Sequence, residues 1–131
     1  GPTLGYRIGA QNACLCYLPD HEPGLATELS TAPPDWISGL GLARGADALI
    51  HDAQYEDEEY ASRWGWGHSG VSDVLAFAKR AEAQRVLMFH HDPGHDDRCL
   101  QSLVEEARGE GDRIGLAGPV ELAREQQTLE L

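Results

Sequence analysis

The stretch RVLMFHHDP, from Arg85 to Pro93, decides the fold of this chain. Its apolar run Val86–Phe89 is short and continuous, which is typical of a strand that is buried on both faces. The run ends abruptly in two histidines and an aspartate, and Pro93 then prevents further pairing in a sheet. A buried strand that delivers imidazoles and a carboxylate at its end is a rigid base for a functional site. We therefore predict a strand over 86–89 and a site after it.

Two further apolar runs end in the same way. The run Cys14–Leu18 leads into the sequence PDHE at 19–22, and the run Ala46–Ile50 leads into His51 and Asp52. The carboxyl end of a buried strand opens on a crevice, where polar side chains can meet a ligand. Three apolar runs that each end in aspartate and histidine are the main indication of function in this sequence.

Strands and helices alternate from Pro34 to Gly109, which predicts an α/β fold. Pro34 begins a short amphipathic helix that Gly45 ends. Val71–Ala81 has the apolar spacing of a longer helix. A third helix is predicted from Asp96, which has the side chain of an N-cap, to near Gly109.

Both ends of the chain contribute further predicted strands. Leu4–Ile8 and Ala13–Leu18 are separated by a short turn that contains glycine, which indicates a hairpin. The tail contains three short candidates, Ile114–Ala117, Val120–Leu122 and Thr128–Leu131. A hairpin at the front and strands at the back predict a mixed β-sheet with flanking helices.

The composition indicates one acidic domain over residues 1–131. The net charge of -12 gives a surface that repels phosphate backbones, so nucleic acid is not an expected partner. No apolar run reaches the length of about eighteen residues that spans a membrane, and the N-terminus lacks a signal-peptide pattern. Cys14, Cys16 and Cys99 lack zinc-knuckle spacing, so we expect reduced thiols and a cytoplasmic location.

The polar residues after the strands favour metal-assisted hydrolysis. Carboxylates and imidazoles can ligate zinc or manganese, or can exchange protons. No serine, cysteine or lysine nucleophile lies in a recognisable motif, and no glycine-rich phosphate loop follows a strand. Five of the six histidines lie in the loops after predicted strands: His21, His51, His68, His90 and His91.

Each candidate also has a structural interpretation. Asp20 follows a proline and fits a turn, and Asp52 fits an N-cap. His68 and His90 could be histidines that pack under a loop. In the loop WGWGHSG at 64–70, the glycines let the backbone approach another group closely. The tryptophans are interpreted as hydrophobic clamps for this loop, with the lining of a pocket as the alternative.

Four motifs together resemble one family. They are YLPDHEP at 17–23, GADALIHDAQY at 45–55, GWGHSG at 65–70 and LMFHHDPGHDD at 87–97. In this order and spacing they resemble the metallo-β-lactamase fold, and more narrowly the bacterial hydrolases grouped with ribonuclease Z and cyclic phosphodiesterases. The resemblance covers 4–131. It implies a mixed β-sheet with flanking helices, one half of the αβ/βα sandwich of that fold.

The resemblance also implies roles for four residues. Asp20 matches the carboxylate that bridges two metal ions, and His90 matches the last histidine ligand. Asp52 and His68 match an acidic residue and a histidine beside the scissile phosphate, where His68 would protonate the leaving oxygen and Asp52 would orient it. The implied cofactors are two divalent metal ions, with zinc expected and manganese or iron as alternatives.

One part of the family pattern has no match in these 131 residues. The family's H-x-H-x-D-H signature and a further histidine ligand belong to an N-terminal metal-binding half. The chain is therefore expected to be the C-terminal half of such an enzyme, and Gly1-Pro2-Thr3 running into a strand favours a cut inside a larger protein. Alone, it should bind metal weakly, be inactive and expose an apolar sheet face. That face predicts a partner: the N-terminal half, or a second copy of the chain.

Three functional hypotheses remain open at this point. The first is part of a metal-dependent phosphodiesterase that acts on small or cyclic phosphodiesters, without membrane or nucleic-acid partners. The alternative is a non-catalytic half-domain that serves as an assembly or regulatory module. A third hypothesis is a mononuclear zinc site made by Asp20, His90, His91 and His95.

Overall fold

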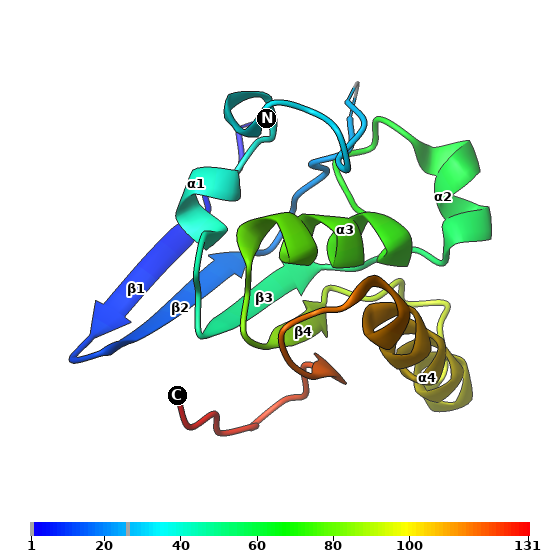
Figure 1. Ribbon diagram of the computed structural model, residues 1–131. Helices are drawn as coiled ribbons and strands as arrows, with labels where there is room; N and C mark the ends of the chain where they lie inside the picture. Colours follow the sequence, from blue (N-terminus) through cyan, green and yellow to red (C-terminus); the bar gives the residue numbers. More distant parts are fainter. Residues whose placement is uncertain (1, 26) are drawn as a thin grey trace.

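The computed structural model describes residues 2–25 and 27–131, so the expectation that concerned Gly1 lies outside the described residues. In this part of the chain, five strands form one sheet in the order β1-β2-β3-β4-β5, with helices packed against it (Figure 1). The strands are β1 (Tyr6–Ala10), β2 (Ala13–Leu18), β3 (Ala48–Asp52), β4 (Val86–Phe89) and β5 (Val120–Leu122). The helices are the 3-10 turn η1 (Pro34–Trp36), α1 (Leu40–Ala43), α2 (Asp57–Arg63), α3 (Val71–Ala81) and α4 (Asp97–Ile114).

The sheet is mixed, as predicted. β1 pairs antiparallel with β2 across a tight turn, and β2, β3, β4 and β5 then pair in parallel. Parallel pairing places the carboxyl ends of β2, β3 and β4 at the same edge of the sheet. The three polar sequences that follow these strands therefore start side by side, which is the arrangement that the site requires.

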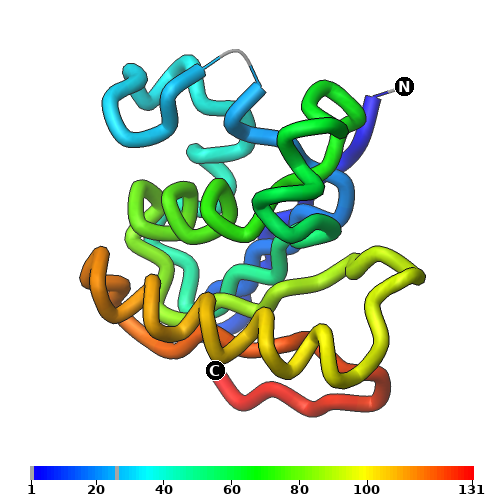
Figure 2. Tube along the Cα trace, turned by 90° about the vertical axis from the view of Figure 1, so that its right-hand side faces the viewer, coloured from blue at the N-terminus to red at the C-terminus, as the bar shows by residue number. Residues whose placement is uncertain are grey.

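One face of the sheet forms the core with the helices. Alternate strand residues, among them Leu18, Leu49 and Met88, join one buried apolar cluster with Leu40 of α1 and Phe77 of α3. Helix α4 packs against both α3 and β5, and Figure 2 shows the two helices as neighbours. A period of two along each strand sends the remaining side chains to the other face.

The other face is apolar and partly exposed. Tyr6 and Ile8 of β1 are exposed, and their partners across the hairpin are Tyr17 and Leu15. The Tyr17 ring stacks on Tyr6, with centroids 6.4 Å apart, and meets the edge of Phe89 at 5.7 Å. This stripe of aromatic and aliphatic side chains agrees with the expectation of an exposed apolar sheet face.

Two predicted elements are wrong at their boundaries because of glycine conformation. The single helix predicted from Pro34 is two short pieces, η1 and α1, which Gly39 separates with φ +71°. The helix predicted to end near Gly109 continues to Ile114 and ends only at Gly115, which has φ +72°. Only a left-handed glycine stops the helix, whereas Gly109 takes ordinary helical angles.

Two smaller expectations also need correction. Of the three strands predicted in the tail, only Val120–Leu122 is formed in the described residues. Strand β3 includes His51 and Asp52, which were expected to follow it. None of the described helices combines the length and the apolar character that a membrane span requires.

Candidate active site

The structure brings the four predicted site residues together. Asp20 follows β2, Asp52 is the last residue of β3, His68 precedes α3 and His90 follows β4. One carboxylate oxygen or ring nitrogen from each lies within 4.8 Å of the others. Four segments that are far apart in sequence therefore converge at the carboxyl edge of the sheet. The roles that the resemblance implies for them remain predictions.

Asp52 and His68 form a fixed pair. The Asp52 carboxylate is fully buried, and its Oδ2 accepts a hydrogen bond from His68 Nδ1 at 2.6 Å. Its Oδ1 accepts from the backbone N–H groups of Ser69 at 3.1 Å and Gln54 at 3.2 Å. Because the carboxylate accepts a hydrogen bond from the Nδ1–H group, the ring of His68 is held in one orientation. The His68 side chain is 21% exposed, so the ring stays accessible.

His90 lies between two carboxylates. Its Nδ1 is 3.3 Å from Asp20 Oδ1 and 3.2 Å from Asp52 Oδ2. Its backbone is left-handed, with φ 61°, immediately after β4. A left-handed conformation is strained for a residue other than glycine, and such strain gathers at functional sites. The turn redirects the chain at the point where the strand delivers its imidazole.

The donor set of Asp20 and His90 fits a divalent metal ion. Two donor atoms bound to the same tetrahedral ion lie about 3.4 Å apart, and those of Asp20 and His90 are separated by 3.3 Å. Both side chains are also substantially exposed, so an ion can reach them. A carboxylate with an imidazole suits zinc, manganese or iron. The residues present therefore fit the metal that the resemblance implies.

Two of the predicted loop histidines belong to the core instead. His51 is fully buried against Phe77, and its Nδ1 donates to the Asp52 carbonyl at 2.7 Å. Its Nε2 lies 2.8 Å from Nδ1 of His21. Burial lowers the pKa of His51 to about 3 and that of His21 to about 4. Both rings are therefore neutral near pH 7 and serve as polar packing behind the site.

Sequence reasoning missed the role of Glu22. This buried carboxylate accepts hydrogen bonds from the N–H groups of Gly65 and Gly67, each at 2.7 Å, and from Tyr60 Oη at 3.1 Å. Both glycines have positive φ, which aims their N–H groups at one acceptor. The loop before His68 is thus anchored to the segment that carries Asp20. The only signal in the sequence was that Glu22 lies two residues after Asp20, and this spacing does not reveal that its partners are the glycine amides.

The tryptophans of the glycine loop do not clamp it. Trp64 and Trp66 are 55% and 67% exposed, so the interpretation of these side chains as hydrophobic clamps is wrong. The buried Glu22 carboxylate performs that function with hydrogen bonds. Hydrogen bonds to a buried carboxylate, and not apolar contacts, therefore fix the backbone conformation of the loop before His68.

His91 and His95 do not join the cluster, contrary to the mononuclear zinc hypothesis. His91 is half-buried, and burial lowers its pKa. His95 turns to a different carboxylate, with Nε2 at 2.9 Å from Glu59 Oε2. Only His90, among the three histidines of this segment, lies within reach of Asp20.

Proteins of known sequence resemble the chain over most of its length. Ribonuclease BN of Escherichia coli (strain K12) is 29% identical over 110 residues, which are 82% of this chain and 35% of that protein. Ribonuclease BN of Escherichia coli O127:H6 (strain E2348/69 / EPEC) is 30% identical over the same shares. The chain therefore spans about a third of the length of the curated relatives that it matches.

Solved structures share the fold. The metallo-beta-lactamase fold protein YhfI from Bacillus subtilis has a TM-score of 0.60 and 20% identity, with 90% of this chain and 40% of that chain covered. Human tRNase Z, short form, has a TM-score of 0.53 and 27% identity over 68% of this chain and 30% of that chain. A diphosphatase of the PhnP family has a TM-score of 0.56 and 21% identity over 97% and 37%.

These likenesses confirm the expected mixed sheet with flanking helices of the metallo-β-lactamase fold. The profile of the family described as "Beta-lactamase superfamily domain" matches residues 1–91, which include Asp20, Asp52, His68 and His90. The chain belongs to the beta-lactamase superfamily and has the metallo-β-lactamase fold.

Proposed function

We propose that this chain is the C-terminal part of a metal-dependent phosphodiester hydrolase whose metal centre is completed by the N-terminal half of the same protein. The observation that carries the proposal is the convergence of Asp20, Asp52, His68 and His90 at one edge of the sheet. Membership of the beta-lactamase superfamily and likeness to proteins named ribonuclease and diphosphatase support hydrolysis at phosphorus.

Asp20 and His90 are the proposed metal ligands. When bound, two divalent ions would activate a water molecule and offset the charge that develops on the phosphodiester. An ion of this type takes about four ligands, so two ions need more donors than these residues provide. The remaining donors are proposed to come from the N-terminal half. Zinc is the proposed metal, with manganese and iron as alternatives.

His68 is the proposed proton donor to the leaving oxygen. An alkoxide is a poor leaving group, and a positioned acid that protonates it lowers the barrier. The Asp52 carboxylate would stabilise the imidazolium through the 2.6 Å hydrogen bond and leave the other ring nitrogen to face the substrate. Because Ser69 and Gln54 hold Asp52 in turn, the pair keeps its orientation without rearrangement.

The exposed apolar face of the sheet is the proposed docking surface for the N-terminal half. Asp52 pairs in register with Phe89, whose ring meets Tyr17 on that face, so the site opens on the same side. A partner that covers the stripe would at once supply ligands and exclude water from the site. A second copy of the chain remains the alternative occupant.

The substrate class divides into two candidates. The net charge of -12 favours small or cyclic phosphodiesters. The likeness to proteins named ribonuclease BN and tRNase Z favours RNA as the substrate, contrary to the expectation from charge. Direct comparison of a cyclic mononucleotide with a tRNA precursor decides between them. The cytoplasm is the proposed location, since Cys14, Cys16 and Cys99 are free thiols.

The experiment that tests the proposed function uses the chain combined with its N-terminal half. Hydrolysis of bis(p-nitrophenyl) phosphate is measured with zinc or manganese. We expect activity that Asp20→Asn and His90→Gln abolish and that the control Asp35→Asn, at an exposed position of η1, retains. If the combined protein is inactive, or if both site variants keep full activity, the alternative of a non-catalytic assembly module is favoured.

A further inference from the structure

A second group of donor atoms lies between the first turns of α2 and α4, apart from the candidate active site. Glu56 is the N-cap of α2, Cys99 lies in the first turn of α4, and His95 lies in the loop before it. One donor atom from each lies within 4.8 Å of the others. We propose that Glu56, His95 and Cys99 form a separate site for a borderline divalent cation of the zinc type.

The distances suit an ion with small adjustment. Cys99 Sγ lies 3.1 Å from Glu56 Oε1. A sulfur and an oxygen bound to one tetrahedral zinc ion lie about 3.6 Å apart, so the two groups need to separate by roughly 0.5 Å. One thiolate, one imidazole and one carboxylate are all ligand types that zinc accepts, and the fourth position stays open to water.

His95 is arranged as a metal-ligating histidine. Its side chain is only 8% exposed, and its Nε2 donates to Glu59 Oε2 at 2.9 Å. With the proton on Nε2, the lone pair lies on Nδ1, which is buried and has no hydrogen-bond partner in the described residues. A carboxylate that fixes the tautomer of a histidine is the usual support of a metal ligand. An unpaired buried nitrogen otherwise needs an explanation, and a cation supplies one.

The charges around the group favour a cation. Glu56 and Glu59 are neighbours in the capping box of α2, Asp57 follows Glu56 in sequence, and Asp96 follows His95. Arg63 pairs with Glu59 of this group, with Nη1 3.5 Å from Oε1. The carboxylate of Glu56 raises the pKa of the Cys99 thiol to about 11. The Cys99 thiol donates its proton in a hydrogen bond to Glu56 Oε1.

Binding exchanges that proton for the metal. The S–H bond of Cys99 breaks, a sulfur–metal bond forms, and the proton leaves to solvent. A metal ion lowers the pKa of a thiol that it binds, so the proton and the metal compete for the Cys99 sulfur. No change of oxidation state is involved.

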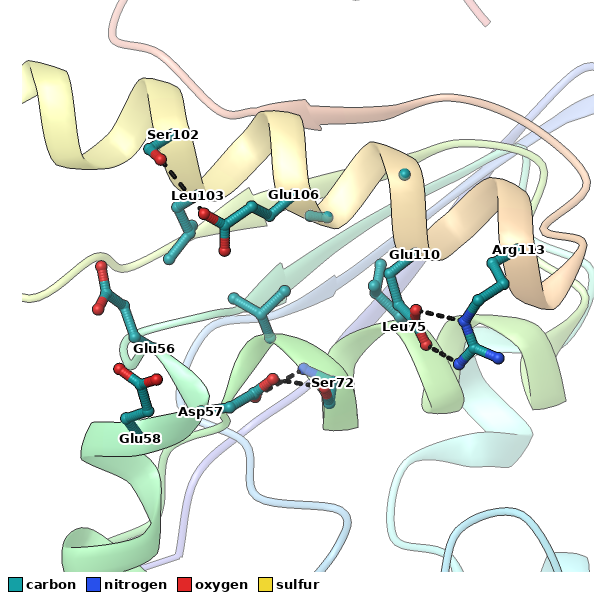
Figure 3. A pocket seen from close by; sticks show the side chains of 13 residues that line it. Glu56, Asp57, Glu58, Ser72, Leu75, Ser102, Leu103, Glu106, Glu110 and Arg113 are labelled. Atoms are coloured by element: carbon teal, nitrogen blue, oxygen red, sulfur yellow. Dashed lines mark hydrogen bonds and ion pairs between the residues drawn. The ribbon is translucent and has the colours of Figure 1, made fainter.

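An acidic groove adjoins the group at Glu56. A groove of about 680 Å³ runs between α2, α3 and α4, and Glu56 lines it. Figure 3 shows Glu56, Asp57 and Glu58 together at one end of the groove. Further along, Glu110 is paired with Arg113, and the floor is apolar. Clustered carboxylates raise the local concentration of cations at such a surface, next to the proposed site.

The test uses cobalt(II) as a spectroscopic probe on the purified chain. A thiolate bound to cobalt gives an intense near-ultraviolet charge-transfer band, whereas carboxylate and imidazole ligands do not. We expect one cobalt ion per chain with this band in the wild-type protein and in the double variant Asp20→Asn/His90→Gln. The band should vanish in Cys99→Ser and persist in Cys14→Ser, whose cysteine lies in β2.

A second measurement begins with the wild-type chain, so that its outcome does not depend on whether a variant folds. Zinc should raise the midpoint of thermal unfolding of the wild-type chain by several degrees, because a ligand that binds only the folded state stabilises it. The shift should be lost in Cys99→Ser and in His95→Gln. Absence of the cobalt band in wild type, or its survival in Cys99→Ser, overturns the proposal. Loss of the band in Asp20→Asn/His90→Gln would assign it to the active site and also overturn it.

Discussion

Replacing Asp52 by asparagine tests the proposed acid and its support. The amide oxygen of asparagine can still accept from the backbone N–H groups of Ser69 and Gln54, as Oδ1 does now. The amide nitrogen then takes the place of Oδ2 and faces His68 Nδ1, which currently donates at 2.6 Å. Two donors cannot face each other, so the imidazole must lose its Nδ1 proton or turn away.

The hydrogen bond that the variant loses sets the expected effect. A buried hydrogen bond to a charged group contributes about 1.5 to 3 kcal/mol, and about 1.4 kcal/mol is a tenfold change in rate. The rate constant kcat should therefore fall about 10- to 150-fold where protonation of the leaving oxygen limits the reaction. His68→Gln should lower kcat at least as much. Asp35→Asn, at an exposed position, serves as the matched control.

Two substrates with different leaving groups separate this role from others. In a cyclic mononucleotide the leaving oxygen is an alkoxide, which needs a proton. In bis(p-nitrophenyl) phosphate the leaving group departs as a stable anion. In the chain combined with its N-terminal half, Asp52→Asn should lower kcat by the full factor of about 10 to 150 with the cyclic mononucleotide. With bis(p-nitrophenyl) phosphate, kcat should fall much less. Equal losses with both substrates would refute the assignment of His68 as the acid.

Further predictions concern stability and dynamics. A Cβ at Gly118 would overlap the carbonyl oxygen of Gln84, so Gly118→Ala should lower the free energy of unfolding by about 1 to 3 kcal/mol. Gly109 lies in α4 with open space around it, so Gly109→Ala should raise that free energy by about 1 kcal/mol; urea titration compares the two. Glu22→Gln should speed hydrogen exchange at the two glycine amides that Glu22 binds, and unchanged exchange would contradict its anchoring role. His51 has a pKa of about 3 when folded and about 6.5 when unfolded, so only the unfolded chain gains its proton between these values. His51 should then contribute a fall of roughly 1.4 kcal/mol per pH unit in the free energy of unfolding as the pH drops below 6.5, and His51→Gln should remove that contribution from the slope.

The strand at 86–89 and the proximity of the four candidate residues could be predicted because polar residues that end neighbouring buried strands are a local signal. A continuous apolar run marks a buried strand wherever it occurs, and the residues that end it define a site. The family resemblance of the four motifs then implied metal-ligand roles for Asp20 and His90, which remain predictions. The structure adds that their donor atoms are 3.3 Å apart.

The features that could not be predicted depend on tertiary contacts. His51 and Asp52 are adjacent, yet strand alternation sends His51 to Phe77 in the core and Asp52 to the site. Glu22 accepts hydrogen bonds from glycine N–H groups more than forty residues away, and the conformation of these glycines cannot be read from the sequence. Likewise, Gly109 does not end α4, because helix packing outweighs the cost of one glycine.

The metal content of the chain combined with its N-terminal half tests the central claim most directly. The account predicts two tightly held divalent ions at the active site of the wild-type protein, loss of at least one of them in Asp20→Asn and in His90→Gln, and full retention in Asp35→Asn. Cys99→Ser in every sample removes any contribution from the second proposed site. If Asp20→Asn/His90→Gln retains both ions, these residues are not metal ligands and the account is contradicted.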